Sequence, residues 1–475
     1  MLRCLLLCAA LLGKAAASRA FLPPLWTSNA TARRIAAARI PTAPKVSRIP
    51  SADSVDSDAI RWPTDQRPTV SGTEPGSSAE RFPSFVVDLD AAPEDRWVKI
   101  ASLPFYRSKV SAAVAYLAGQ VPSWLLPMLE AILADVEGYF GPELGAEMKS
   151  LAAAFGSDRC KLGDIVAFNL IMQLESIGLN CSNWNTTGPT TKGDPGCIDV
   201  NPKQTWCYCH TPNRTSNLVS VASFKRHFGL DASSSAPGLC TSVVAEDAAT
   251  GHIFHGRNLD WNIPPEVREM VIDAHFQRGG KTVFIGTTVV GFVGVFNGMR
   301  LGQFSASINA RGKGGKIIAN ILQMLKYKSR TPSQHLRMVL QNTSVAGFHG
   351  AVAALSEGHQ VDENYFIVGG IKRGEGAVIS RDRDKARDVW FLNSSTWYRL
   401  QTNYDHWEPV PKADDRRTPG RSNMDMMGPS GIGANGDGML KDVLEKWPTF
   451  NHHTDYTGVF SAATNLYRSM VWMQP

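Results

Sequence analysis

The sequence lacks the glycine-rich motifs with which proteins bind nucleotides. Neither GxGxxG nor GxxxxGK[ST] occurs where a predicted strand meets a predicted helix, so nucleotide binding is unsupported. The chain has no internal repeat and no pair of CxxC knuckles of the zinc-ribbon kind. We therefore expect neither an organic cofactor nor a bound metal.

Acidic residues are absent from residues 1–50, which carry eight Lys and Arg side chains, although the whole chain has a formal net charge of only +6. The rest of the chain therefore carries a net charge of −2. A protein that binds nucleic acid needs its basic surface on the folded domain. We exclude DNA and RNA as partners on this ground.

Residues 1–20 have the layout of a secretory signal peptide, with Arg3 before a short apolar run and small residues after it. The run is too short to span a membrane. Residues 21–84, rich in Pro, Ser, Ala and Thr, indicate a flexible or processed leader. This leads to a secreted or lysosome-like lumenal location. Because residues 21–50 are Arg-rich and acid-free, a plastid transit peptide is the alternative.

Six N-x-Ser/Thr triplets favour the same secretory route, since such triplets accept N-linked glycans there. They begin at Asn29, Asn180, Asn185, Asn213, Asn342 and Asn393.

Six of the eight cysteines lie beyond the predicted signal peptide. If Cys240 is a free nucleophile, an odd number is left, which predicts at least one further free or intermolecularly paired thiol. Four cysteines cluster in a Gly/Pro/Asn-rich stretch, where two local disulfides are the simplest interpretation. A zinc site that uses Cys207, Cys209 and His210 is the alternative. The clustered cysteines are Cys181, Cys197, Cys207 and Cys209.

Hydrophobic periodicity predicts a helical region followed by a strand-rich region, with order beginning near Phe85. A loop-like insertion, residues 177–238, separates the two regions and is longer than loops in compact domains usually are. Helices are predicted over residues 123–140, 142–155, 162–176, 317–327 and 333–341. Strands are predicted over residues 241–245, 252–261, 270–276, 282–296, 303–309, 365–369, 376–380, 388–393 and 397–402. This order indicates an α+β fold with helices packed on a sheet.

Cys240 begins a predicted strand, and a turn at residues 247–251 leads to a hairpin partner that carries Arg257 and Asp260. Paired strands lie about 4.8 Å apart, so we expect Arg257 or its neighbours beside Cys240. A neighbouring cation lowers the pKa of a thiol, and a carboxylate can orient that cation.

The segment CTSVVAEDAATGHIFHGRNLDW, which begins at Cys240, resembles the nucleophile segment of the acid ceramidase and N-acylethanolamine-hydrolysing acid amidase family. These are choloylglycine-hydrolase-like cysteine hydrolases of the N-terminal-nucleophile class. The stretches GTTVVGFVGVFNG, GEGAVISRDRD and QTNYDHWEPVPKADDRRTP extend the similarity, which runs from about Val87 to Trp472 except before Cys240. The resemblance implies a four-layer αββα sandwich with a helical N-terminal α chain.

The resemblance also implies self-cleavage between Leu239 and Cys240. The products would be an α chain of residues 85–239, which includes the insertion, and a catalytic β chain of residues 240–475. The implied substrate is an N-acyl lipid, ceramide or N-acylethanolamine, cut to a fatty acid and an amine. The family roles fall on Cys240 as nucleophile, Arg257 and Asp260 as the pair contacting it, Asn403 as the oxyanion-hole asparagine and Arg416 as a supporting arginine.

A cut before Cys240 would place a thiol and an α-amine on one residue, so that nucleophile and base are held together. An oxyanion donor such as the Asn403 amide is worth about 3 kcal/mol. Near about pH 4.5 an ordinary α-amine is protonated, and correcting this takes roughly 4 kcal/mol. Repulsion from Arg257 can supply part of that, whereas Asp260 acts in the opposite sense and is therefore assigned to positioning.

Two features depart from the family pattern. Ala310 stands where the family commonly has a glutamate, and the long insertion stands where the family has a few residues before the cysteine. The insertion is hypothesised to be a cleavable cover over Cys240.

Several neighbouring groups have simpler interpretations. His252 and His255 are assigned to packing or hydrogen bonding rather than to a Cys-His dyad. The charges of Asp414, Asp415 and Arg417 are interpreted as a solvated cluster. An apolar helix is expected to pack in the core, with membrane-surface contact as the alternative. Its residues are Trp124, Leu125, Met128, Leu129, Ile132 and Leu133.

Two other functions remain open at this point. One is a cysteine acylase for smaller amides, of the penicillin V or bile-salt type. The other is a secreted glycoprotein that keeps the fold without turnover, which Ala310 and the insertion favour.

Overall fold

The computed structural model describes residues 79–120, 132–174, 189–191, 206–208, 239–261, 263–311, 317–411, 414–451 and 453–472. All of them lie in one compact unit, Pro50–Pro475. Several predictions fall outside these residues. They concern the signal peptide, the four glycan triplets before Cys240, the zinc or disulfide pairing of Cys181, Cys197, Cys209 and His210, and the apolar-helix residues Trp124, Leu125, Met128 and Leu129. Within them, no helix is both long and apolar enough to cross a membrane.

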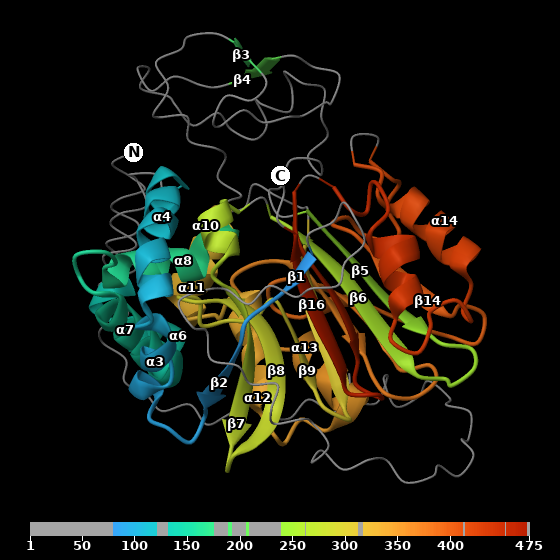
Figure 1. The fold of residues 1–475 in the computed structure, drawn as a ribbon, viewed down its shortest axis with the longest axis horizontal. Helices are drawn as coiled ribbons and strands as arrows, with labels where there is room; N and C mark the ends of the chain where they lie inside the picture. The colour runs from blue at the N-terminus through green and yellow to red at the C-terminus, as the bar shows by residue number, and fades with distance from the viewer. Residues whose placement is uncertain are drawn as a thin grey trace. The chain divides into compact units, whose positions relative to one another are not determined.

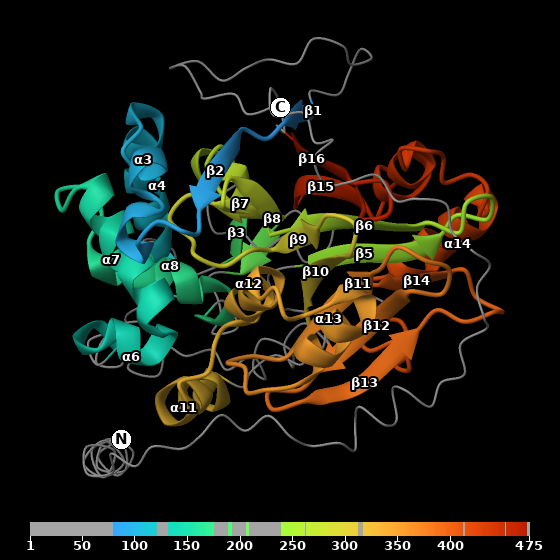
Figure 2. The same ribbon diagram turned by 90° about the horizontal axis from the view of Figure 1, so that it is seen from below.

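Two β-sheets lie face to face at the centre of this unit (Figures 1 and 2). Every strand pairs with antiparallel neighbours except at the parallel pair β2 and β7. The six-stranded sheet, in the order β1-β16-β15-β6-β5-β14, contains β1 (Ala79–Arg81), β5 (Leu239–Glu246), β6 (Ile253–Asp260), β14 (Tyr398–Gln401), β15 (Thr454–Ser461) and β16 (Leu466–Trp472). The eight-stranded sheet, in the order β13-β12-β11-β10-β9-β8-β7-β2, contains β2 (Ser84–Asp88), β7 (Val271–Arg278), β8 (Lys281–Val289), β9 (Asn297–Arg300), β10 (Phe304–Ala310), β11 (Asn364–Gly369), β12 (Gly376–Arg381) and β13 (Ala386–Phe391).

An apolar layer joins the facing sides of the sheets, where Val244 and Ile253 meet Tyr365, Ile367 and Val378. Helices α12 (Pro332–Gln341) and α13 (Gly347–Ser356) cover the outer side of the eight-stranded sheet, and α14 (Arg417–Met427) with the π-helical turn η6 (Met439–Leu444) covers the other sheet. The order helix, sheet, sheet, helix confirms the αββα sandwich and the α+β class (Figure 2).

A group of helices packs beside the sandwich, at the left of Figure 1. It contains α3 (Val98–Ala101), α4 (Pro104–Gln120), α6 (Val136–Phe140), α7 (Pro142–Phe155) and α8 (Leu162–Leu174), which one apolar core joins to the eight-stranded sheet. The remaining elements are the short turn η3 (Pro93–Asp95), α10 (Pro265–Arg268), α11 (Ile317–Tyr327) and the two-stranded pair β3 (Pro189–Thr191) and β4 (Trp206–Tyr208) inside the insertion. Ile132 is fully buried and Leu133 packs against the same core, so these two residues of the apolar helix have the predicted core role.

Two predicted elements were wrong in extent. The helix over 123–140 does not run on, because Asp135 leaves the helical conformation and caps a new helix, α6, through the backbone N–H of Gly138. The strand over 282–296 ends at Val289, and the Thr288 hydroxyl then donates to the carbonyls of Phe292 and Gly294 in a turn. Regular structure is also present before Phe85, where order was expected to begin, since β1 spans Ala79–Arg81.

Candidate active site

The hairpin of β5 and β6 places Arg257 beside Cys240. The hairpin turn is closed by the Asp247 carboxylate, which accepts from the Thr250 backbone N–H and hydroxyl at 2.8 and 2.6 Å. In the resulting register Cys240 faces Leu259, and the Arg257 side chain crosses to the sulfur, with Nη2 at 3.3 Å from Sγ. Both side chains are buried.

Arg416 connects the other candidate residues. Its Nη1 donates to the Cys240 carbonyl at 2.9 Å and to the Asp260 carboxylate at 3.3 Å, and its Nη2 donates to Asn403 Oδ1 at 2.7 Å. The Asp414 carboxylate holds this guanidinium from the other side, at 2.6 and 2.8 Å. The structure therefore brings all five residues singled out in the sequence into one buried cluster.

Asn403, which follows β14, has its side-chain oxygen directed at Cys240. Oδ1 accepts from the Cys240 backbone N–H at 2.7 Å, while Nδ2 donates to the Ala310 carbonyl at 2.8 Å. The contact at position 310 comes from the backbone, so it does not depend on the side chain that stands there.

Asp260, at the end of β6, is held by three donors. Its carboxylate accepts from the Thr454 hydroxyl at 2.7 Å and from Asn451 Nδ2 at 3.1 Å, in addition to Arg416. Burial raises the pKa of this carboxyl to about 6, although Arg416, Thr454 and Asn451 favour its charged form. These contacts fix the orientation of Asp260, in keeping with a positioning role.

Burial also raises the pKa of the Cys240 thiol, and nearby Arg257 opposes that effect. A buried thiol of this kind is neutral and a poor nucleophile. The cluster therefore needs a base to take the thiol proton.

The charged run at residues 414–417 is not the solvated cluster that the sequence indicated. Asp414 pairs with Arg416 as described, and Arg417 is buried and donates to the carbonyls of Tyr404, Asp405 and Glu408. Only Asp415 is exposed, where it accepts from the Thr418 backbone N–H at the start of α14. Asp414, Arg416 and Arg417 are therefore structural parts of the site rather than solvated surface charges.

His255 has the hydrogen-bonding role expected for it. Its ring nitrogens lie 3.1 and 2.9 Å from the hydroxyls of Ser305 and Ser307, and its ring meets Phe460 edge to face. Burial lowers the pKa of His255 to about 3, with a further contribution from Arg257.

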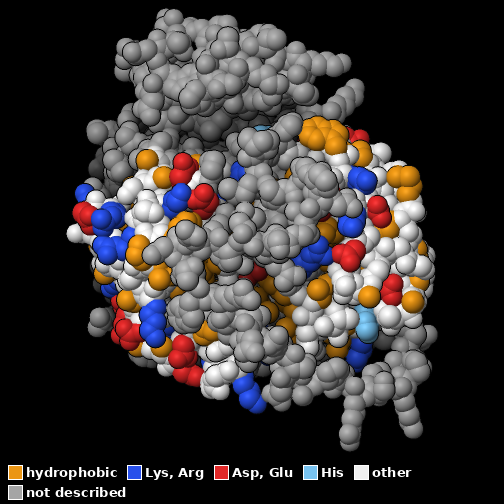
Figure 3. All heavy atoms as spheres, in the orientation of Figure 1, with side chains coloured by type: hydrophobic (Ala, Val, Ile, Leu, Met, Phe, Trp, Pro, Cys, Tyr) orange, Lys and Arg blue, Asp and Glu red, His pale blue; other side chains and the backbone are white. Residues whose placement is uncertain are grey.

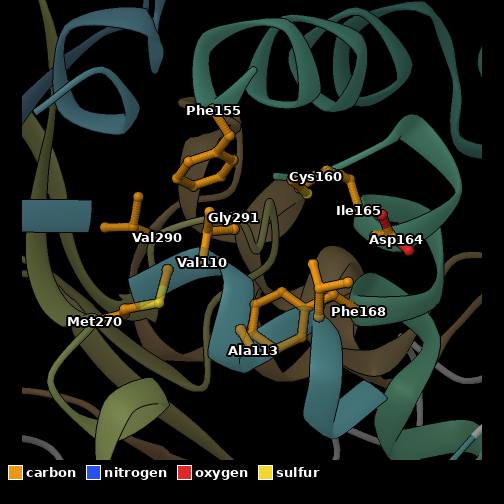
Figure 4. Close-up of a pocket in the computed structure, with 11 residues that line it drawn as sticks. Val110, Ala113, Phe155, Cys160, Asp164, Ile165, Phe168, Met270, Val290 and Gly291 are labelled. Carbon is orange, nitrogen blue, oxygen red and sulfur yellow. The ribbon is translucent and has the colours of Figure 1, made fainter. Parts of the chain in front are cut away.

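A small apolar cavity lies between α4, α8 and the turn after β8 (Figure 4). Phe168 lines it and meets Phe292 edge to face at 5.8 Å, and Phe292 stacks on Phe296 at 5.1 Å. The Phe296 carbonyl accepts from Arg257 Nη1 at 3.0 Å. A row of three packed aromatic rings thus lies between the cavity and the Phe296 carbonyl that Arg257 contacts. The cavity is lined by Val110, Ala113, Val114, Phe155, Cys160, Asp164, Ile165, Phe168, Met270, Val290 and Gly291.

Cys160 is a second free, buried thiol, as the odd cysteine count predicts. Among the described residues, no group of His, Cys, Asp and Glu is arranged to hold a metal ion. On the face seen in Figure 3, the coloured basic and acidic side chains are intermixed.

Sequence reasoning missed Asp414, Asn451 and Thr454, and also Asn309, whose amide bonds to the strand before Asn403. Asp414 stands two residues before Arg416 in the stretch that carries the resemblance. The pairing of β15 with β6 would have revealed Thr454, and the packing of the two sheets would have revealed Asn309.

Comparisons with known proteins match most of the chain. Residues 80–140 match the family described as the beta subunit of N-acylethanolamine-hydrolyzing acid amidase. These residues belong to the segment before Cys240, which is called the α chain above. Residues 240–437 match the linear amide C-N hydrolases of the choloylglycine hydrolase family. The Rattus norvegicus N-acylethanolamine-hydrolyzing acid amidase is 32% identical over 400 residues, covering 83% of this chain and 89% of the relative. The Mus musculus acid ceramidase is 27% identical, covering 82% and 85%. A solved chain of the Caenorhabditis elegans N-acylethanolamine-hydrolyzing acid amidase ortholog is 32% identical with a TM-score of 0.45, covering 50% of this chain and 100% of that one.

Proposed function

The chain belongs to the family of N-acylethanolamine-hydrolyzing acid amidase and acid ceramidase, a family of amidohydrolases, and on that premise we propose that it hydrolyses the amide bond of N-acyl lipids through Cys240. The observation that carries the proposal is the cluster of Arg257, Asp260, Asn403 and Arg416 around the Cys240 sulfur, amide nitrogen and carbonyl. The products are a fatty acid and an amine.

We propose that the precursor first cuts its own Leu239–Cys240 bond. The Cys240 sulfur attacks the Leu239 carbonyl and displaces the Cys240 nitrogen, which takes the thiol proton, so that the peptide bond becomes a thioester. Water then hydrolyses the thioester to give a Leu239 carboxylate and a free thiol. The Cys240 N–H already donates a hydrogen bond to Asn403 Oδ1, and the Cys240 carbonyl accepts one from Arg416. The new α-amine therefore forms where these two side chains already hold the residue.

In the mature enzyme the α-amine takes the thiol proton, and the sulfur attacks the amide carbonyl of the substrate. An Asn403 N–H stabilises the oxyanion, an interaction of about 3 kcal/mol. Collapse of this intermediate returns the proton to the leaving amine and leaves an acyl-thioester on Cys240. Water hydrolyses the thioester and restores the thiol. Arg257 lowers the pKa of both the thiol and the amine by its charge, and Asp260 holds Arg416 in place.

The fatty-acyl chain is assigned to the apolar side of the site, where Phe168, Phe292 and Phe296 pack, and its binding would have to widen the small cavity beside Phe168. Burial of each methylene contributes about 0.8 kcal/mol. A long acyl chain therefore gains binding energy that a small amide does not. A preference for long acyl chains would therefore distinguish a lipid amidase from an acylase for smaller amides.

We place the enzyme in an acidic, lysosome-like lumen, reached through the signal peptide at residues 1–20. The relatives carry "acid" in their names, and nothing in the comparisons favours the plastid alternative. The insertion at residues 177–238 is proposed as a cover that is trimmed after the cut. Membrane contact through Trp124, Leu125, Met128 and Leu129 is proposed as the route by which lipid reaches the site.

Intact mass and turnover, measured together at about pH 4.5 and pH 7, test the proposal. The wild-type chain is expected to yield two fragments, one beginning Cys-Thr-Ser-Val, and to hydrolyse ceramide or an N-acylethanolamine in preference to penicillin V. Cys240→Ala should remain one chain without turnover. Cys160→Ala controls for loss of a buried thiol and should be cut normally. Turnover by uncut chain, or by Cys240→Ala, would refute the mechanism.

A further inference from the structure

Asn309 is a fully buried side chain of β10 that the proposed mechanism does not use. Its Nδ2 donates to the carbonyls of Gln401 and Thr402 at 2.9 and 3.3 Å, and its Oδ1 accepts from the Ser242 hydroxyl at 2.7 Å. Ser242 and Gln401 face each other across β5 and β14 of the six-stranded sheet, whereas Asn309 belongs to the other sheet. Its amide therefore ties the two sheets together.

These contacts converge on Asn403. The carbonyl of Thr402 is part of the peptide bond to Asn403, so the Asn309 amide fixes the backbone immediately before it. The residue after Asn309 supplies the carbonyl, that of Ala310, which accepts from Asn403 Nδ2. One dipeptide of β10 thus holds the backbone and the side chain of the same asparagine.

The other end of Asn309 reaches the nucleophile strand. Ser242 lies two residues after Cys240 on β5, so the two share a side of the strand. Asn309 therefore sets the spacing between the strand that carries the sulfur and the segment that carries the oxyanion donor. Catalytic groups need to be held within about 0.5 Å of their working positions.

We infer that Asn309 is a positioning residue for the oxyanion donor Asn403. This inference rests on the proposed function, because an oxyanion forms only if Cys240 attacks a carbonyl. An oxyanion interaction acts in the transition state and not in the bound ground state. Its loss therefore lowers kcat and kcat/KM together and leaves KM unchanged.

Asn309→Asp is the sharpest test. The aspartate keeps an acceptor for Ser242 but places an oxygen where Nδ2 donates to Gln401 and Thr402. With kcat expressed per chain carrying a free N-terminal Cys240, we expect kcat to fall by about tenfold to a hundredfold, with KM within about twofold. Ser242→Ala removes one anchor only and should give a smaller decrease in kcat of the same kind.

Alkylation of Cys240 by iodoacetamide separates positioning from a general loss of structure. Alkylation displaces iodide at carbon and forms no oxyanion, so it needs the sulfur but not Asn403. The Asn309→Asp enzyme should therefore be alkylated at the wild-type rate, within about twofold, while amide turnover falls. A parallel fall in both rates would overturn the inference.

Asn258→Asp is a matched control. Asn258 is also fully buried, and its amide also donates to two backbone carbonyls, those of Leu444 and Thr449, and accepts from a hydroxyl, that of Thr457. These contacts face η6, on the side of β6 opposite Arg257. Equal loss of kcat in both variants would refute a special role for Asn309.

Two outcomes keep the inference and the proposed function apart. A wild-type chain without amide turnover refutes the proposed function. If the wild-type chain hydrolyses the amide and Asn309→Asp has a normal kcat, only the inference about Asn309 is refuted. If Asn309→Asp yields too little folded protein, Asn309→Ser, which keeps one hydroxyl donor, takes its place. Its kcat for amide hydrolysis and its rate of alkylation by iodoacetamide are then compared with those of the wild type.

Discussion

Arg337 and Glu147 lie 190 residues apart in the sequence and form a bidentate, fully buried ion pair, with N to O distances of 2.5 and 2.6 Å. Glu147 belongs to α7 and Arg337 to α12, so the pair joins the helical region before the proposed cut to the sandwich after it. The Glu147 carboxylate also accepts from Trp97 Nε1 and from Arg96. Three donors thus satisfy this buried charge. We therefore expect the pair to hold the two fragments together once the Leu239–Cys240 bond is broken.

Glu147→Gln should destabilise the cut enzyme, although β1, β2 and the shared apolar core still join the fragments. Removal of one partner leaves Arg337 buried without its counter-charge, which costs about 3–5 kcal/mol. We expect the cut enzyme to unfold at a lower urea concentration than the cut parent. The control is Glu137→Gln, because Glu137 pairs with Lys149 at the surface, where such a pair contributes less than about 1 kcal/mol. A cut Glu147→Gln enzyme with the urea stability of the parent would contradict this role.

Asp414→Asn should weaken catalysis through Arg416. A charge-assisted hydrogen bond contributes about 1.5–3 kcal/mol, and Asp414 supplies two of them to the guanidinium that contacts Cys240, Asp260 and Asn403. We expect kcat to fall by about tenfold or more, with KM within about twofold.

The neighbouring carboxylate provides the control for Asp414. Asp415→Asn alters only the exposed bond to the Thr418 N–H at the start of α14. It should cost at most about 1 kcal/mol of stability and leave kcat within about twofold. Equal kcat values for the two variants would exclude a role of Asp414 in holding Arg416 for catalysis.

The sequence predicted best those elements whose signals are local. Helix α7 begins at Pro142 and ends before Gly156, and α11 spans residues 317–327, both with the predicted bounds. A proline in the first turn and a strong apolar period account for this. Helix α13 was missed because its small residues give a weak period and Ala346 provides no side-chain cap. Helix α14, with Pro419 and Gly420 inside it, depends on packing against η6 and the sheet.

The residues of the candidate site also differ in whether a local sequence signal places them. Cys240, Arg257 and Asp260 lie on one hairpin, so local turn chemistry places them together. Asn403 and Arg416 were found only by resemblance, since nothing local connects them to Cys240. The partners of Asp260 on β15 and the loop before it depend on the order of strands in the sheet, which the sequence pattern did not specify.

Ala113→Leu should shorten the acyl chains that the enzyme accepts. Ala113 is a buried residue of α4 that lines the apolar cavity, and filling such a space costs about 1–3 kcal/mol. We expect the ratio of kcat/KM for a hexadecanoyl amide to that for a butanoyl amide of the same amine to fall by about tenfold. Ala115→Leu, exposed on the same helix, should leave the ratio unchanged. An unchanged ratio in Ala113→Leu would mean that the acyl chain binds elsewhere.

Asn342 and Asn393 should carry N-linked glycans when the protein passes through a secretory route. Both are exposed, and in both triplets the hydroxyl of the third residue donates to the asparagine Oδ1, at 2.7 Å from Ser344 and 2.8 Å from Ser395. Asn342→Gln and Asn393→Gln should each lower the intact mass by one glycan.

Two pairs of serine and threonine variants test these glycans further. Ser344→Ala and Ser395→Ala should have the same effect as the asparagine substitutions. Thr343→Ala and Ser394→Ala keep the triplets and should keep the glycans. Full glycan mass in Asn342→Gln or Asn393→Gln would exclude modification of the substituted asparagine.

His255→Gln should make the fold less sensitive to acid. The pKa of His255 is lowered to about 3 in the folded chain, against about 6.5 when unfolded. The neutral ring therefore favours the folded state above about pH 6.5, and this contribution is lost as the pH falls towards 3. The loss is at most about 1.4 kcal/mol per pH unit. Glutamine cannot titrate, so urea unfolding of His255→Gln should differ less between pH 7 and about pH 4.5 than that of the parent chain.

Cys240→Ala is the suitable background for the His255 measurement, because it should remain a single chain at both pH values. His335 behaves in the same sense, since burial lowers its pKa to about 4, so one substitution removes only part of the acid sensitivity. Accordingly, His255→Gln with His335→Gln should flatten the dependence further. His252→Gln, at a half-buried position beside the hairpin turn, is the control and should not. If His255→Gln keeps the full acid sensitivity, His255 is charged in the folded chain, and its place between Ser305 and Ser307 needs a different explanation.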